Sequence, residues 1–181
     1  IGSLVAVAYS SVLSFLSIYA QELNLLDAAS FFFVVFAVVM LVARPFSGRL
    51  FDSKGPHIVI YPALGLFLIG LVLLSITQTS FMLLLSGAFI GLGYGTIVPS
   101  LQTLAIQATD RNRSGHATAT FFTLFDTGIA AGSYILGIVA TQLGYGHLYF
   151  YTAIFMIVVI VCYKLVLHRK EVTKFNLKET H

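Results

Sequence analysis

Six long apolar stretches, joined by short polar or glycine-rich connections, constrain the fold of this chain more than any other feature. They cover residues 1–20, 28–48, 58–76, 81–107, 115–142 and 147–167. A helix of about 20 apolar residues crosses the hydrocarbon core of a bilayer, so each stretch is long enough to span it. The runs are continuous, unlike the alternating apolar and polar residues of a membrane β-barrel. We therefore expect an all-α integral membrane protein with six transmembrane helices.

The composition also indicates lipid as the solvent of this chain. Charged residues make up only 9% of its 181 residues, whereas a soluble domain carries about 25%. A chain of this size cannot bury so much apolar surface in one water-soluble core. The polar tail, residues 168–181, is expected to be solvated and partly disordered. The chain begins at Ile1 rather than at a methionine, and we expect an N-terminal part to be missing.

All ten Lys and Arg residues fall on one side when the six stretches are threaded through a membrane. They are Arg44, Arg49, Lys54, Arg111, Arg113, Lys164, Arg169, Lys170, Lys174 and Lys178. Basic residues concentrate in cytoplasmic loops. We therefore expect a multi-pass protein of the cell membrane, with both ends of the six-helix block in the cytoplasm. No basic run lies beside exposed aromatic residues, so nothing indicates a nucleic-acid partner.

The segment 44–57, between the second and third stretches, is the most specific motif in the chain. Gly48 and Gly55 permit a close approach and a positive φ in a turn. Asp52 is a short carboxylate that could cap a helix N-terminus or meet a nearby arginine. From these residues alone, an ordinary charged loop between two helices is an equally good interpretation.

Gly48, Leu50, Asp52 and Gly55 have the spacing G-x-L-x-D-x-x-G, which resembles the signature loop of the major facilitator superfamily. The preceding Arg44 and Pro45 are similar to the second-half version of this loop in drug and sugar exporters. Three further segments resemble, in the right order, the seventh, tenth and eleventh helices of such exporters: 17–23, 91–99 and 125–128. The loop departs from the family pattern at 56–57, Pro and His, where two basic residues are usual.

The resemblance implies the C-terminal half of a transporter, built as two three-helix repeats of opposite topology. It also implies transport of a small-molecule substrate across the lipid bilayer by alternating access, without a cofactor. The gating loop would comprise Arg44, Gly48, Leu50, Asp52 and Gly55. In the family the aspartate of this loop latches the two halves together, so the partner of Asp52 would be an N-terminal six-helix half of the same polypeptide. An aspartate that only caps its own loop is the alternative.

Asp126 is the one acidic residue deep in an apolar stretch, about 16 Å from the start of that stretch. A bare carboxylate at mid-membrane depth is costly, so it should be paired, protonated or facing water. A carboxyl group that takes up and releases protons would suit export driven by a proton gradient. Asp126 is therefore the candidate coupling residue, and a hydrogen bond to a neighbouring helix is the structural alternative.

The few polar and aromatic groups within the stretches predict a largely apolar substrate cavity. We expect its lining to include Tyr9, Tyr94, Gln102 and Phe122. Such a cavity suits a lipophilic or amphipathic molecule better than a sugar phosphate. Glycines at four-residue spacing in the fourth and fifth stretches predict close packing of helices.

Enzymatic function has no support in the sequence. It contains no H-E-x-x-H motif and no P-loop, and the single cysteine, Cys162, excludes a multi-cysteine metal site. Four of the five histidines fall in or beside connections and are expected to be solvated: His57, His116, His147 and His168. A non-transporting six-helix scaffold or sensor is the competing interpretation of the whole chain.

Overall fold

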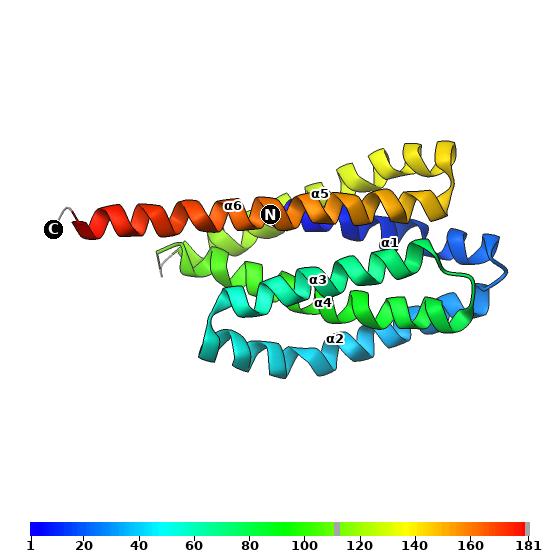
Figure 1. The fold of residues 1–181 in the computed structure, drawn as a ribbon, viewed down its shortest axis with the longest axis horizontal. Helices are drawn as coiled ribbons and strands as arrows, with labels where there is room; N and C mark the ends of the chain where they lie inside the picture. The colour runs from blue at the N-terminus through cyan, green and yellow to red at the C-terminus, as the bar shows by residue number, and fades with distance from the viewer. Residues whose placement is uncertain (111–112, 180–181) are drawn as a thin grey trace.

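The structure, a computed structural model, describes residues 1–110 and 113–179, and these ranges form six helices (Figure 1). They are α1 (Gly2–Glu22), α2 (Leu26–Lys54), α3 (Pro56–Ser75), α4 (Ser80–Gln107), α5 (Ser114–Leu143) and α6 (Tyr145–Glu179). Each is long and apolar enough to cross a membrane, α6 over its first part, Tyr145–Leu165. The prediction of an all-α protein with six membrane-length helices is confirmed.

α2 is longer than the sequence predicted, because it continues past residue 48 to Lys54. The motif expected as a loop is therefore helical almost to its end. Gly55 alone makes the turn, with a φ of 89° that favours glycine, and α3 then begins at Pro56. The prediction that Gly48 also serves the turn is wrong, because Gly48 lies inside the helix.

α6 also differs from its expected bounds. The helix continues to Glu179, whereas the sequence predicted a partly disordered tail from residue 168 onwards. The hydropathy of the sequence marks where the chain leaves the membrane, and a polar segment can extend the same helix beyond that point.

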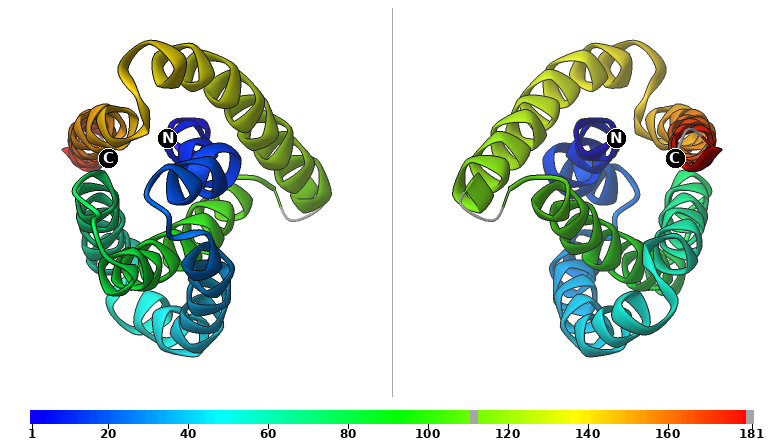
Figure 2. Two further views of the ribbon diagram at one scale, coloured as in Figure 1. Left: turned by 90° about the vertical axis from the view of Figure 1, so that its right-hand side faces the viewer. Right: turned by 90° about the vertical axis from the view of Figure 1, so that its left-hand side faces the viewer.

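The packing of the helices follows the two-repeat arrangement expected from the sequence. α4 packs on α2 and α3, α1 packs mainly on α5 and α6, and α3 lies beside α6 (Figure 2). The same contacts recur when α1, α2 and α3 are matched in order with α4, α5 and α6. α4 packs on α2 as α1 packs on α5, and α4 packs on α3 as α1 packs on α6. Because each repeat contains three spans, the second repeat begins on the opposite side of the membrane and is inverted relative to the first.

Glycines allow the helices of two pairs to approach closely. A Cβ added at Gly91 of α4 would lie 2.6 Å from the carbonyl oxygen of Phe36 in α2. A Cβ added at Gly128 of α5 would lie 2.5 Å from the carbonyl oxygen of Ser3 in α1. Helices approach this closely only where a residue has no side chain, so the predicted close packing of both glycine stripes is observed.

The connections α2–α3 and α4–α5 and the C-terminal end of α6 lie at the same end of the bundle (Figure 1). We refer to it as the basic end, because Lys54 ends α2 and Arg113 immediately precedes α5. Arg44 and Arg49 lie in the last three turns of α2, also toward this end. Arg111 lies outside the described residues.

Candidate functional site: an aromatic cluster and a polar cleft

An aromatic cluster joins three helices at the middle of the bundle. Tyr9 of α1 stacks on Tyr94 of α4, with ring centroids 3.8 Å apart and an interplanar angle of 18°. Phe36 of α2 lies 6.0 Å from each of these rings. The glycine contacts place α2 against α4 at this level, because Phe36 is also the residue that meets Gly91. Both tyrosines are only partly buried.

The cluster continues onto α5 through a chain of phenylalanines. Phe125 lies 6.3 Å from Tyr94, and Phe121 stacks on Phe125 at 5.9 Å. Phe122 lies edge-on to Phe121 at 5.4 Å and forms the exposed rim of the cluster. The structure thus connects three of the four predicted cavity residues, Tyr9, Tyr94 and Phe122, in one apolar surface.

Gln102, the fourth predicted cavity residue, lies elsewhere. It is eight residues beyond Tyr94, or about 12 Å farther along α4 toward the basic end. There it lines a polar cleft of about 430 Å³ between α2 and α4. The cleft is lined by Arg44, Ser47, Gly48, Phe51, Asp52, Pro99, Ser100, Gln102 and Thr103.

The polar cleft contains most of the predicted gating residues. Arg44, Gly48 and Asp52 line it, whereas Leu50 faces an apolar groove on the other side of α2 and Gly55 forms the turn. Asp52 does not cap α3, because the N-cap of α3 is Gly55 and no side chain caps that end. The alternative of a capping aspartate is therefore not supported.

Among the described residues, internal hydrogen bonds occupy two of the hydroxyl groups that line the polar cleft. The Ser47 hydroxyl donates to the carbonyl oxygen of Arg44 at 3.1 Å, and the Thr103 hydroxyl donates to that of Pro99 at 2.9 Å. Both hydroxyls are thus used within their own helices. The cleft presents the guanidinium of Arg44, the carboxylate of Asp52 and the amide of Gln102, a set that can bind complementary charges from another segment.

Asp126 lies in the middle of α5, one residue after Phe125 of the aromatic cluster. The side of α5 formed by Phe125, Gly128 and Gly132 is buried, and its two glycines meet α1. Asp126 lies outside this buried side and is exposed. α5 and α2 bury the smallest shares of their residues among the six spans.

One histidine departs from its predicted environment. His57, in the first turn of α3, is half-buried, and its Nδ1 forms a hydrogen bond of 3.0 Å with the Tyr163 hydroxyl of α6. The prediction that His57 is solvated is therefore wrong. His116 and His147 are exposed, as expected, and the side chain of His168 lies outside the described residues. The described residues contain no group of three or more His, Cys, Asp or Glu side chains that could hold a metal ion.

An all-α bundle of six membrane-length helices with inverted three-helix repeats defines a multi-pass membrane protein of the transporter type. A family model described as Major Facilitator Superfamily matches residues 1–180, and the chain belongs to this family.

Relatives of this chain bear names that refer to drug resistance or transport. It is 32% identical over 171 residues to the multidrug resistance protein MdtG of Citrobacter koseri, covering 91% of this chain and 41% of that protein. It is 31% identical over 167 residues to MdtG of Escherichia coli, covering 88% of this chain and 40% of the relative. An uncharacterized MFS-type transporter of Methanocaldococcus jannaschii is 28% identical, with 83% of this chain and 39% of the relative covered. The chain therefore spans about two fifths of the length of these relatives.

Proposed function

We propose that this chain is the C-terminal half of a secondary transporter that exports a small lipophilic or amphipathic molecule by alternating access. In this proposal the export is coupled to proton entry across the cell membrane, and the basic end faces the cytoplasm. Family membership and the names of the relatives support transport as the activity. The observation that carries the substrate class is the aromatic cluster, which brings together rings from α1, α4 and α5.

The chemistry of the aromatic cluster suits an apolar substrate with a flat or cationic group. Aromatic faces attract apolar surfaces and, through their quadrupole, organic cations. The two tyrosine hydroxyls, on Tyr9 and Tyr94, add hydrogen-bonding groups without a fixed charge. Among the described residues, no arginine or lysine belongs to this cluster, so it offers no fixed positive charge to a strongly anionic substrate.

Asp126 is proposed to couple transport to protons. Its exposed position on α5, beside the aromatic cluster, supports a location that faces a second six-helix half of the polypeptide. In that setting the carboxyl group could alternate between water and protein, as a proton carrier must. The exposed side of α5 and the polar-cleft side of α2 are proposed to pack on that N-terminal half, and the polar cleft would receive its latching residues.

Asp126→Asn tests the coupling and, with it, the proposed function. The complete polypeptide is reconstituted in liposomes with a pH gradient, and accumulation of a lipophilic cationic dye is measured. We expect Asp126→Asn to reduce gradient-driven accumulation to the level without a gradient, because asparagine cannot carry the proton. The matched control, Asp27→Asn at the start of α2, should transport normally.

Two outcomes would contradict this proposal at different points. Gradient-driven transport by the Asp126→Asn protein would remove Asp126 from the coupling step. Absence of dye movement by the wild-type protein with any gradient, for a panel of lipophilic cations and neutral dyes, would contradict export of such molecules.

A further inference from the structure

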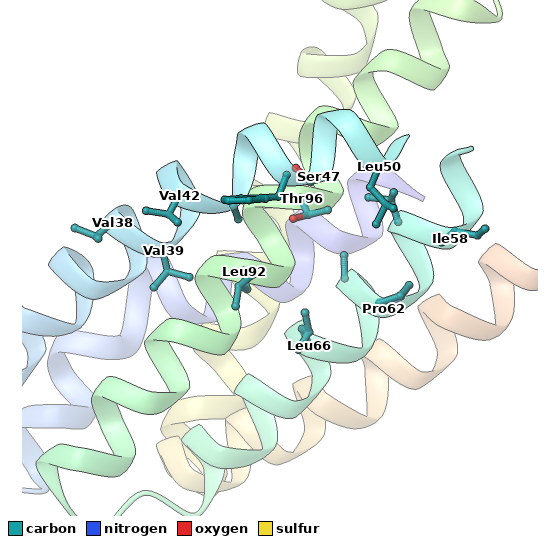
Figure 3. Close-up of a pocket in the computed structure, with 14 residues that line it drawn as sticks. Val38, Val39, Val42, Ser47, Leu50, Ile58, Pro62, Leu66, Leu92 and Thr96 are labelled. Carbon is teal, nitrogen blue, oxygen red and sulfur yellow. The ribbon is translucent and has the colours of Figure 1, made fainter. Parts of the chain in front are cut away.

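A second, apolar groove lies on the outside of the first repeat. It has a volume of about 480 Å³ and runs between α2 and α3, with α4 as its floor (Figure 3). It exists because α2 and α3 both pack on α4 and only weakly on each other. Val42 and Phe46 of α2 and Ile58 of α3 border it, and each of these side chains is more than half exposed.

The lining of the groove offers almost nothing to a polar ligand. Ser47 and Thr96 supply the only side-chain oxygen atoms among the lining residues. The Ser47 hydroxyl already donates to the carbonyl oxygen of Arg44, and Thr96 is buried. Hydrocarbon is therefore the complementary occupant of this groove.

The length of the groove matches one leaflet of a bilayer. From Val38 to Leu50 along α2 the rise is about 18 Å, at 1.5 Å per residue. The hydrocarbon core is about 30 Å thick, so one leaflet contributes roughly 15 Å. The groove begins near mid-membrane and ends at the α2–α3 turn, where a lipid of that leaflet has its headgroup.

Basic and acidic residues lie on different sides of α2 at the end of the groove. Lys54 is four residues beyond Leu50, on the same side of α2, and Arg49 is three residues beyond Phe46. Both side chains are exposed. Asp52 lies on the opposite side of the helix, in the polar cleft. The headgroup end of the groove therefore carries the cationic Lys54, and Asp52 faces away from it.

The groove is separate from the proposed substrate surface. Its floor is formed by Leu92 and Thr96 of α4, each two residues from Tyr94. Two residues turn a helix by about 200°, so the groove and the aromatic cluster occupy opposite sides of α4. An occupant of the groove would be held outside the transport path.

We propose that this groove binds an acyl chain of an anionic phospholipid, whose phosphate is held by Lys54. The proposal does not depend on the proposed function. One lipid held in this way would cover the apolar gap between α2 and α3 and join the two helices at their connection. The binding combines burial of acyl CH₂ groups with attraction of a basic residue for an anionic headgroup.

Two pairs of variants of the complete polypeptide test this assignment. Val42→Trp fills the groove, and Val158→Trp is its control at an exposed position of α6. Lys54→Gln removes the headgroup contact, and Lys164→Gln is its control on α6. Each protein is equilibrated with vesicles of phosphatidylglycerol or phosphatidylcholine and extracted in mild detergent. Retained phospholipid is then counted by native mass spectrometry, and circular dichroism identifies variants that have not folded.

We expect wild type and both controls to retain one phosphatidylglycerol per chain in preference to phosphatidylcholine. Val42→Trp should lower retention of both lipids at least about tenfold, because the acyl contacts are lost. Lys54→Gln should lower the preference for phosphatidylglycerol about fivefold, the effect of one basic residue near an anionic surface.

Several results would overturn the lipid site. Equal phospholipid retention by Val42→Trp and Val158→Trp would show that the groove holds no lipid. If Val42→Trp does not fold, an unchanged preference of Lys54→Gln for phosphatidylglycerol would show the same. A wild-type dimer that Val42→Trp dissociates would assign the groove to a second copy. Displacement of the retained lipid by a transported dye would assign it to substrate.

Discussion

At residue 91 the backbones of α2 and α4 come closer than any side chain would permit. The Cβ that a larger residue brings would lie 2.6 Å from the carbonyl oxygen of Phe36 and 3.1 Å from its Cα. Backbone atoms cannot rotate aside as the end of a side chain can, so the two helices would have to separate. Tyr94 is three residues farther on the same helix, and its stacking on Tyr9 depends on the same placement of α4.

Gly91→Val should therefore destabilise the protein by about 1–3 kcal/mol, the usual cost of overpacking a close-packed interior. The control is Gly48→Ala on α2, where an added Cβ meets nothing within 4 Å. That variant should be neutral or more stable by up to about 1 kcal/mol, because alanine favours a helix over glycine. Thermal unfolding of the purified variants measures both effects. A Gly91→Val protein with the same thermal unfolding midpoint as the wild type would contradict the close contact.

The predicted cavity residues show how far the sequence predicts which side chains lie together. Tyr9, Tyr94, Gln102 and Phe122 were selected because they are polar or aromatic within apolar stretches. In the structure three of them belong to the aromatic cluster, whereas Gln102 lines the polar cleft. These helices are apolar on most sides, so their sequence gives little indication of which side meets which neighbour. The distance along the helix can, in contrast, be calculated from the sequence, and it already separates residue 102 from residue 94.

At the scale of elements, α3 and α6 are joined near the basic end by side chains rather than by glycines. His57 forms its hydrogen bond with Tyr163, and Tyr61 packs edge-on against the same tyrosine at 5.2 Å. This contact crosses between the two repeats, because α3 belongs to the first and α6 to the second. It fixes the relative position of the two peripheral helices at their basic end.

Tyr163→Phe should lower stability by about 1 kcal/mol, the net value of a typical hydrogen bond, while the ring contacts remain. Tyr151→Phe, at an exposed position of the same helix, is the control and should have no effect. The midpoint of unfolding in detergent distinguishes the two variants. If both variants behave alike, the His57 contact contributes nothing to the joining of α3 and α6.

Element positions were predictable from the sequence, but two element ends were not. Hydropathy located all six spans, because an uninterrupted apolar run of this length has few other solutions. It placed the end of α2 at residue 48 and that of α6 at residue 167, although the helices reach Lys54 and Glu179. Hydropathy reports where lipid ends, whereas a helix ends where its backbone hydrogen bonding stops, here at Gly55 for α2.

At the scale of the whole molecule, the connections alternate between two ends of the bundle (Figure 1). Lys54 and Arg113 lie at the basic end, and Gln78, in the connection between α3 and α4, lies at the other. The chain has a single cysteine, Cys162, so this part of the protein is easily made cysteine-free by Cys162→Ser.

Labelling of single cysteines in this background tests the orientation. Lys54→Cys and Arg113→Cys should react with an impermeant maleimide only from the cytoplasmic side of oriented vesicles, and Gln78→Cys only from the other side. The reason is that basic residues are retained on the cytoplasmic side. Reaction of Lys54→Cys and Arg113→Cys from opposite sides would contradict the threading of the helices.

The exchange of partners between the repeats has a consequence for how the protein is made. α1 finds its main neighbours in α5 and α6, but the ribosome, at about 5–20 residues per second, completes α5 several seconds after α1 has emerged. During that interval α1 has lipid around a surface that will later be covered. Its Ser10 and Ser11 hydroxyls, buried in the finished fold, donate to the carbonyl oxygens of Val7 and Ala8 within the same helix. These two hydroxyls therefore need no hydrogen-bond partner from a later helix. Newly inserted α1 can remain in the bilayer without the cost of unpaired hydroxyl groups in hydrocarbon.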